Sequence, residues 1–253
     1  MNIDFPKKIH LPALRALWRE AFSDSEAFLD CFFKTAFAPK RCRCVWLGDE
    51  LAAALYWFDF SYNGGRVAYI YAVATARAHQ GKGICTSLMK NTHSHLKSLG
   101  YDVAVLVPGS EKLFRFYEKI GYKTCVYIDE FESKPSEKAV RIRKIETDEY
   151  KILRSLLLPT GSVIQENEAL DFLTTQAELY AGDNFLLTAR KEEDRLFGIE
   201  LLGNTDIASD ILFTLGAKEG KFRAPDGNKP FAMSLALSEK AHTPPSYFGL
   251  AFD

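Results

Sequence analysis

The chain has 253 residues, with 32 Lys and Arg against 33 Asp and Glu and a formal net charge of -1. A charge this close to zero argues against a nucleic-acid-binding protein, which normally needs a basic surface. Hydrophobic residues make up 47% and charged residues 26%, a balance that excludes a disordered, collagen-like or coiled-coil chain. The length fits one large domain or two small ones.

Cysteine usage and apolar segments indicate where the protein works. The five cysteines are an odd number in a long chain, which favours a reducing compartment over a disulfide scaffold. The N-terminal segment has no leader pattern, and no run approaches the ~18 apolar residues that a membrane span needs. We therefore expect a cytoplasmic protein with no membrane partner.

The first half of the chain begins with helical patterns and continues with strands. Apolar residues at helical spacing predict two N-terminal helices, the second capped by Ser23 or Asp24. Three strands separated by turn-forming Gly, Asp and Asn residues follow, a spacing that favours hairpins. Their predicted ranges are Cys42–Leu47, Leu51–Phe60 and Arg66–Thr75.

A second group of elements follows these strands. A glycine-bearing loop at residues 79–83 opens a long helix with apolar residues at helical spacing. Tyr101–Val107 predicts a short buried strand. Ser110 is placed to cap the next helix, which Gly121 ends, and Tyr122–Phe131 predicts a further strand.

Residues 133–138 form the clearest linker-like stretch, and we place a domain border there, giving domains 1–134 and 135–253. Beyond it the pattern of strands and helices partly restarts. The predicted elements are a strand at Val140–Ile145, helices around Ile152–Leu157 and Leu170–Tyr180, strands at Phe185–Ala189 and Leu196–Leu202, and a helix at Asp206–Leu215. Three strand-like segments end the chain, namely Lys221–Ala224, Phe231–Leu237 and Tyr247–Phe252.

The loop at residues 79–83 has the features of an anion site. A strand, a Gly-bearing turn and a helix attract negative charge, because helix N-terminal N–H groups and the helix dipole point toward the turn. Gly81 and Gly83 let a phosphate approach the backbone closely, and Lys82 adds positive charge. The turn lacks the endings of a Walker loop and of a dinucleotide fingerprint, which disfavours a nucleotide-binding regulator.

The order of elements resembles that of the GNAT acyltransferases over at least residues 40–132. Three motifs carry the resemblance: Gln80-Gly81-Lys82-Gly83-Ile84-Cys85 for the superfamily's Q/R-x-x-G-x-G/A turn, Leu106-Val107-Pro108, and F-Y-E-K-I-G-Y from Phe116 to Tyr122. Cys85 stands at the last small position of that turn. Val73-Ala74-Thr75 is similar to the two-domain enhanced-intracellular-survival branch, which usually has Pro where this chain has Arg77.

The resemblance implies a fold, a co-substrate and a set of site residues. The fold is an α/β (α+β) GNAT fold followed by a second, degenerate GNAT-like domain, and the co-substrate is acetyl-CoA, with no metal. The implied contacts are Val73, Ala74 and Thr75 with pantetheine and the thioester carbonyl, Gln80, Gly81, Lys82, Gly83, Ile84, Cys85 and Thr86 with the pyrophosphate, and Ser110 where the family often has a pantetheine-binding Asn. Tyr117 would protonate the departing CoA thiolate.

The implied function is N-acetylation of a primary amine on a small molecule or peptide, in a cleft that the second domain completes. The alternative is a non-catalytic acyl-CoA-binding sensor or scaffold. Retention of Tyr117 favours the enzyme, and the absence of an obvious base favours the sensor. No motif distinguishes an antibiotic, a polyamine, a peptide or a protein lysine as the acceptor.

Other cysteines and histidines have structural interpretations. Cys42 and Cys44 share one face of a strand, and without a second ligand pair they are interpreted as packed thiols. His93 and His95 are two residues apart on a helix, so we expect one at the surface and one in the core. Cys85 lies near a helix N-terminus, where thiol pKa values can fall, but its predicted role needs only a small residue.

The general base is the least defined part of the site, because the strand from Arg66 to Val73 carries no Asp or Glu. Some two-domain relatives use the chain's own C-terminal carboxylate, so we hypothesise that the α-carboxylate of Asp253 orients or deprotonates the amine. An equally weighted alternative is that the apolar last residues only complete a sheet. A third is an ordered water relayed by Tyr69, Tyr71 or Glu130.

Overall fold

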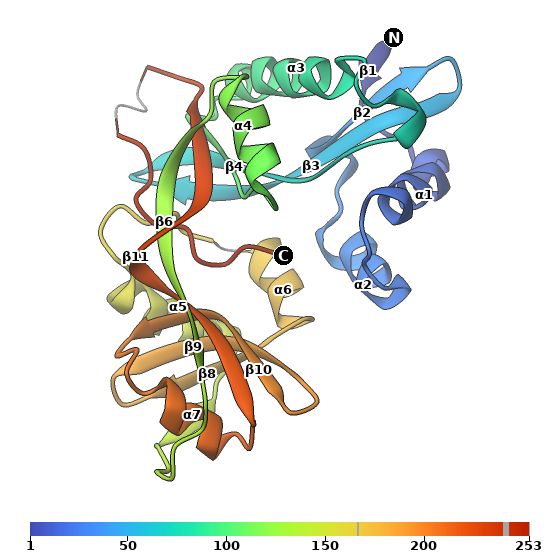
Figure 1. Ribbon diagram of the computed structural model, residues 1–253. Coiled ribbons are helices and arrows are strands. Elements are labelled where there is room, and N and C mark those ends of the chain that lie inside the picture. Colours follow the sequence, from blue (N-terminus) through green and yellow to red (C-terminus); the bar gives the residue numbers. More distant parts are fainter. Residues whose placement is uncertain (166, 240–242, 253) are drawn as a thin grey trace. The chain divides into compact units, whose positions relative to one another are not determined.

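The computed structural model describes residues 1–165, 167–239 and 243–252 (Figure 1). The chain divides into two compact units, Met1–Lys123 with Met233–Pro244 and Thr124–Ala232 with Pro245–Asp253. The border expected after residue 134 therefore differs from the division in the structure. The reason is that residues 133–138 only connect two strands, whereas Met233–Ala236 returns to the first unit as an antiparallel neighbour of one of its strands.

The first unit is built on one mixed sheet. Its strands are β1 (Asn2–Asp4), β2 (Cys42–Leu47), β3 (Glu50–Tyr62), β4 (Gly65–Thr75) and β5 (Val103–Leu106), in that order across the sheet, followed by the end of β11 (Glu219–Ala236). β4 and β5 are parallel, and the other neighbours are antiparallel. The three predicted hairpin strands are confirmed, while β1 is too short for a sequence pattern to predict.

The helices of the first unit are α1 (Leu11–Ala21), α2 (Glu26–Cys31), α3 (Ile84–Ser98) and α4 (Glu111–Glu118), with a π-helical turn η2 (Phe32–Ala36) and short 3₁₀ turns η1 (Lys8–His10), η3 (Pro39–Arg41) and η4 (Arg77–His79). The predicted cap of α2 was wrong by one or two residues: Ser25 Oγ accepts from Phe28 N at 3.2 Å. Asp24 instead accepts a hydrogen bond from Trp18 Nε1 at 2.8 Å.

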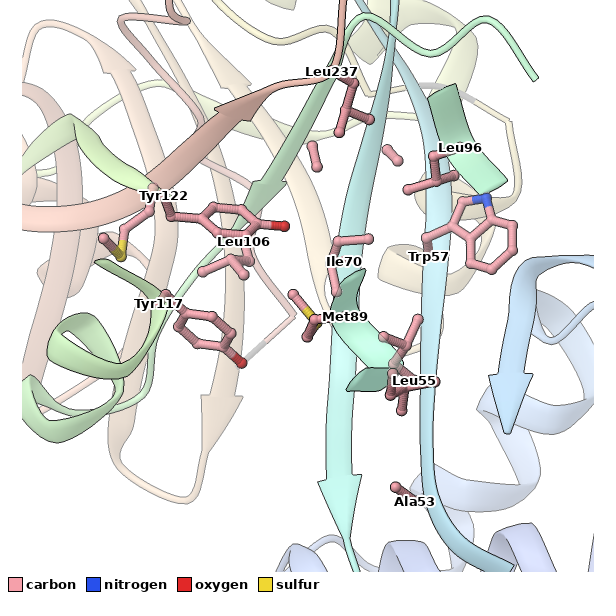
Figure 2. Close-up of a cluster of buried hydrophobic side chains, with 14 of the residues drawn as sticks. Ala53, Leu55, Trp57, Ile70, Met89, Leu96, Leu106, Tyr117, Tyr122 and Leu237 are labelled. Atoms are coloured by element: carbon pink, nitrogen blue, oxygen red, sulfur yellow. The ribbon is translucent and has the colours of Figure 1, made fainter. Parts of the chain in front are cut away.

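Alternate residues of β3 face opposite sides of this sheet, as the period of a strand requires. Leu55 and Trp57 belong to a buried cluster with Met89 and Leu96 of α3 (Figure 2). On the other face the ring of Tyr56 lies 5.3 Å from that of Trp18 in α1. The sheet of this unit is thus covered by α3 on one face and by the N-terminal helices on the other.

The second unit contains β6 (Lys123–Ser133), β7 (Ile142–Lys144), α5 (Thr147–Leu157), α6 (Glu168–Thr174), β8 (Glu178–Gly182), β9 (Phe185–Glu192), β10 (Arg195–Gly203), α7 (Ala208–Thr214) and most of β11. Three sequence predictions are corrected here. The helix predicted over Leu170–Tyr180 ends at Thr174, and Tyr180 lies in β8. Lys221–Ala224 and Phe231–Leu237 lie in one continuous strand, which ends at Ala236. In the described part of Tyr247–Phe252 there is no strand, only a single bridge between Tyr247 and Ser162.

Both units arrange their elements in the same order. In each, a first strand and two helices precede three antiparallel strands, and a crossover helix then leads to a parallel strand. The sheet orders β1-β2-β3-β4-β5 and β7-β8-β9-β10-β11 correspond strand by strand. The second unit differs at the crossover, where α7 is half as long as α3 and where Phe222 fills the space beside Gly198.

No helix in the described ranges is long and apolar enough to cross a membrane.

Candidate functional site

The centre of the candidate site is an irregularity in β4. Tyr71 pairs with Tyr56 and Ala74 with Ala54, so two residues of β4 lie opposite Leu55 alone. One of these two, Ala72, has a positive φ of 46°, a conformation that costs a non-glycine residue energy and is concentrated at functional sites. Sequence reasoning missed this bulge, because no glycine marks it.

Beyond the bulge, β4 separates from its parallel neighbour. The pairing of β4 with β5 covers Val67, Ala68 and Tyr69, whereas β4 itself continues to Thr75. In the part of the chain that the structure describes, the edge of β4 after Tyr69 therefore has no partner from β5. Unpaired N–H and C=O groups along a strand edge can bind an extended ligand by main-chain hydrogen bonds. Val73, Ala74 and Thr75 therefore lie where β4 has separated from β5, and their contacts with pantetheine and the thioester carbonyl stay a prediction.

Two exposed side chains of the turn after β4 hydrogen bond to nearby backbone carbonyls, and the two glycines leave the backbone open. Gln80 Nε2 donates to Thr75 O at 3.1 Å, and Lys82 Nζ donates to Ala78 O at 2.9 Å. Gly81 and Gly83 have left-handed φ angles of 74° and 78°, and a Cβ on either would meet nothing within 4 Å. The two glycines thus provide both the turn geometry and an unobstructed approach to the backbone.

Helix α3 begins at this turn with an uncapped N-terminus. Gly83 is the N-cap and supplies no side chain, and Ser87 N makes the first helical hydrogen bond, to Gly83 O at 3.0 Å. The N–H groups of Ile84, Cys85 and Thr86 consequently have no partner within the helix. Together with the helix dipole, they form a binding site for an anion such as a phosphate.

Thr75 and Cys85 lie side by side between the end of β4 and the start of α3. The Thr75 hydroxyl oxygen is buried and makes no hydrogen bond of ordinary geometry to any of the described residues. Burial raises the pKa of the neighbouring Cys85 thiol to about 11, and the Thr75 hydroxyl lowers it by a smaller amount. The thiol is therefore protonated at neutral pH, which agrees with a packing role rather than a nucleophilic one.

Tyr117 lies on α4 within the same buried cluster as α3 (Figure 2). Its side chain is only 6% exposed, and burial, followed by the proximity of Cys85, raises the pKa of its phenol well above the usual 10. Unlike the hydroxyls of Tyr101, Tyr122, Tyr150 and Tyr247, its hydroxyl makes no hydrogen bond to any residue that the structure describes. Among the described residues, Tyr117 is thus a protonated phenol whose hydroxyl has no hydrogen-bond partner.

Ser110 performs the capping role that the sequence allowed. Its Oγ accepts from Leu113 N at 3.4 Å, a long hydrogen bond at the N-terminus of α4. The contact with pantetheine, which the resemblance implied for this position, stays a prediction.

The remaining chemically active residues are mostly structural. Cys42 and Cys44 are fully buried with their sulfurs 3.8 Å apart, so the packed-thiol interpretation is confirmed. All five cysteines are free. Across the described residues, no group of three or more His, Cys, Asp or Glu side chains is arranged to hold a metal ion.

The candidates for a general base do not form a defined site. Asp253 lies outside the described residues. Glu130 is engaged elsewhere, because its carboxylate pairs with Lys221 at 2.7 Å, Arg223 at 3.3 Å and Lys229. Burial acts to raise the pKa of Glu130, but Lys221 and Lys229 outweigh it and lower the pKa to about 2. A carboxylate held this strongly as an anion is a poor proton acceptor, which disfavours Glu130 as a relay.

Comparison with known proteins now adds a family and a fold. Residues 2–125 match the family described as acetyltransferase (GNAT) domain. A GCN5-related N-acetyltransferase from Anabaena variabilis ATCC 29413 is similar with a TM-score of 0.72 at 13% identity, over 94% of this chain and 73% of that one. Eis1 from Mycobacterium abscessus gives a TM-score of 0.64 at 13% identity, over 95% and 75%.

A putative acetyltransferase from Pyrococcus horikoshii gives a TM-score of 0.65 at 15% identity, over 98% of this chain and 93% of that one. At these identities the likeness to solved structures shows the fold. No curated protein sequence matches the chain. The family match and the shared fold confirm the resemblance that the motifs indicated.

Proposed function

The chain belongs to the GNAT acyltransferases, and on this premise we propose that it transfers the acetyl group of acetyl-CoA to a primary amine. The observation that carries the proposal is the row of backbone N–H groups at the start of α3 that have no partner within the helix and no side-chain cap among the described residues, beside two glycines with open space. A pyrophosphate needs convergent N–H donors and close access to the backbone, and this turn supplies both.

The surroundings of the turn suit the rest of acetyl-CoA. The edge of β4 after Tyr69 offers main-chain groups to the amides of the pantetheine arm. The Thr75 hydroxyl is a buried polar group in need of a hydrogen-bond partner, which a pantetheine amide or the thioester carbonyl would satisfy. Cys85, at the position of a Gly or Ala in the family, is protonated and small enough to leave this approach open.

In the proposed reaction, the neutral amine nitrogen attacks the thioester carbonyl carbon and forms the new C–N bond. The tetrahedral intermediate then collapses with cleavage of the C–S bond. The departing thiolate takes the proton of the Tyr117 hydroxyl, and the proton lost by the amine nitrogen returns through water to the Tyr117 phenolate. The products are the N-acetyl amine and the CoA thiol, so atoms and charge balance.

The local environment explains why a phenol with a raised pKa can act as the acid. A thiol in water has a pKa near 8.5, and a proton would not leave a phenol for such a thiolate. The Cys85 thiol shows that this environment destabilises a sulfur anion, because burial raises the pKa of that thiol to about 11. A CoA thiolate formed beside it experiences the same penalty. Burial raises the pKa of the Tyr117 phenol further still, so the proton lost by the amine must reach the phenolate as the thiolate is protonated, and no buried anion is left behind.

The proposal is tested by binding and turnover together. Isothermal titration measures the affinity for acetyl-CoA, and free thiol release is followed with polyamines, amine-bearing antibiotics and lysine peptides as acceptors. Tyr117→Phe keeps the ring and removes the proton donor, so we expect kcat to fall ~10²–10⁴-fold with the acetyl-CoA affinity unchanged. Full activity of Tyr117→Phe contradicts the acid role. Tight acetyl-CoA binding without turnover of any amine would instead support a non-catalytic sensor.

A further inference from the structure

A histidine and a tyrosine outside the predicted site form a hydrogen-bonded pair behind Tyr117. His93 Nε2 and the Tyr122 hydroxyl are 2.8 Å apart, and their ring centroids are 5.4 Å apart. The spacing of His93 and His95 predicted one surface and one core residue, but both side chains are half-buried. The prediction failed because α3 packs on the sheet with a broad face, so residues two apart can both be partly covered.

Tyr122 in turn contacts the ring of Tyr117. The two ring centroids are 5.7 Å apart at an interplanar angle of 63°, an edge-to-face arrangement favourable for aromatic pairs. Figure 2 shows the two rings as neighbours within the buried cluster. Tyr122 is only 2% exposed, so its hydroxyl needs a partner inside the protein, and His93 supplies it.

The His93–Tyr122 pair links α3 to the residues that follow α4. The proposed reaction requires α3 and α4 to keep a fixed position relative to each other. The N–H groups proposed for the pyrophosphate belong to α3, whereas Tyr117 belongs to α4. Among the described residues, the His93–Tyr122 bond is the one side-chain hydrogen bond between α3 and residues 111–123. The rest of that contact is apolar packing, which does not fix direction as a hydrogen bond does.

We propose that His93 and Tyr122 are positioning residues, which hold the Tyr117 phenol at a fixed place relative to the co-substrate bound at the start of α3. This inference rests on the proposed function, because the position of the Tyr117 hydroxyl matters only if that hydroxyl is the proton donor. Catalytic groups lose rate steeply when displaced by fractions of an ångström. The hydrogen bond between His93 of α3 and Tyr122 in the turn after α4 limits such displacement.

A direct acid–base role for the pair does not fit its chemistry. Burial lowers the pKa of His93 to about 4, so the imidazole is neutral across the physiological range. Burial, and then the proximity of Tyr117, raises the pKa of Tyr122, so its phenol keeps its proton. A pair that stays neutral on both sides between pH 6 and pH 9 can orient a neighbour without changing its own charge.

The test compares four variants in thiol release from acetyl-CoA, with the fastest amine of the panel or, if none reacts, with water as acceptor. Tyr122→Phe removes the hydroxyl, His93→Leu removes its partner, and His93→Gln keeps a hydrogen-bonding group. The matched control is Tyr101→Phe, which removes another buried hydroxyl from the same cluster, one bonded to Trp57 Nε1 at 3.3 Å and to Asp59.

We expect Tyr122→Phe and His93→Leu to lower kcat about three- to tenfold, the worth of one neutral hydrogen bond, with KM for acetyl-CoA within twofold. We expect His93→Gln to recover part of the loss and Tyr101→Phe to leave kcat unchanged. In a Tyr117→Phe background, Tyr122→Phe should have no further effect on kcat. That dependence on background distinguishes positioning of Tyr117 from a general loss of stability.

Two results overturn the inference. One is an unchanged kcat in Tyr122→Phe, and the other is an equal fall of kcat whether Tyr122→Phe is made in the parent chain or in the Tyr117→Phe variant. Failure of the proposed function has a different signature, in which Tyr117→Phe alone keeps full activity or the chain does not bind acetyl-CoA. Thermal unfolding of each variant, measured beside kcat, shows whether a lost rate follows a lost fold.

Discussion

Gly83 and Gly100 lie at opposite ends of α3 and share the same left-handed φ of 78°. A Cβ on either would meet nothing within 4 Å. Their electrostatic surroundings differ, because Gly83 precedes the N–H groups at the helix start, which have no partner within the helix. Gly100 closes the other end, where its own N–H donates to Lys97 O and Tyr101 N donates to Leu96 O.

This relationship provides a matched pair of variants for the co-substrate site. A side chain at either position meets the same backbone strain, about 1–2 kcal/mol. Only Gly83→Glu places a carboxylate where the pyrophosphate is proposed to bind. We expect Gly83→Glu to weaken acetyl-CoA binding at least about tenfold and Gly100→Glu to leave the affinity unchanged. Isothermal titration measures both affinities, and equal loss in the two variants would remove the pyrophosphate from this turn.

The second prediction concerns the pH dependence of the rate. Burial, with Cys85 as the next cause, raises the pKa of Tyr117 above its usual 10, so the donor keeps its proton throughout pH 6 to 10. The attacking amine must be neutral, so the rate should rise with pH until the pKa of the acceptor is passed. We expect kcat profiles for two amines of different pKa to differ only in the position of this rise. A shared fall between pH 7 and pH 9 would contradict a phenol donor.

Much of the first unit could be predicted from its sequence, because its signals are local. Turn residues at Gly48 and at Asn63-Gly64-Gly65 separate the strands, and helical spacing defines α3. The glycines of the anion site are likewise visible in the chain. The bulge at Ala72 was missed because a positive φ in a strand without glycine is imposed by the surrounding sheet.

The second unit was less predictable. A run of apolar residues predicts that the segment is buried, but it does not predict whether its backbone pairs with a strand. Tyr247, Phe248, Leu250 and Ala251 are all buried, as their apolar character indicated. Their backbone is held differently from a strand, with Gln165 Nε2 donating to Leu250 O at 2.6 Å. Such side-chain contacts join residues far apart in sequence, and no local pattern announces them.

The third prediction concerns Glu130 and acid stability. The pKa of its carboxyl is lowered to about 2 from an ordinary value of 4.5. Because the folded pKa is the lower one, the stabilisation is complete above about pH 5 and is lost as the pH falls toward 2. We expect Glu130→Gln to reduce the free energy of unfolding at pH 7 by up to about 3 kcal/mol. Urea unfolding of both proteins from pH 7 to pH 2.5 measures whether the difference shrinks on acidification, and a constant difference would contradict the prediction.

The second unit also contains a buried ion pair in a fully bonded polar cluster. Arg154 and Glu200 are 4% and 1% exposed at their side chains, with Arg154 Nε 2.7 Å from Glu200 Oε2. The hydroxyls of Tyr150 and Tyr247 each donate to Glu200 at 3.1 Å. Burial acts to lower the pKa of Arg154, and the Glu200 carboxylate outweighs it and raises that pKa, so the guanidinium stays charged.

The fourth prediction follows from the asymmetry of such a pair. Arg154→Met leaves the Glu200 carboxylate buried with two hydroxyl donors and no cation, which typically costs about 3–5 kcal/mol. The double variant Arg154→Met/Glu200→Gln removes both charges, while the amide oxygen still accepts from Tyr150 and Tyr247. We expect the double variant to be more stable than Arg154→Met alone and to lie within about 2 kcal/mol of the parent chain. Urea unfolding of the three proteins at pH 7 measures this order. If the double variant is the least stable of the three proteins, the prediction is wrong, because removing both charges would then cost more than leaving the Glu200 carboxylate without its cation.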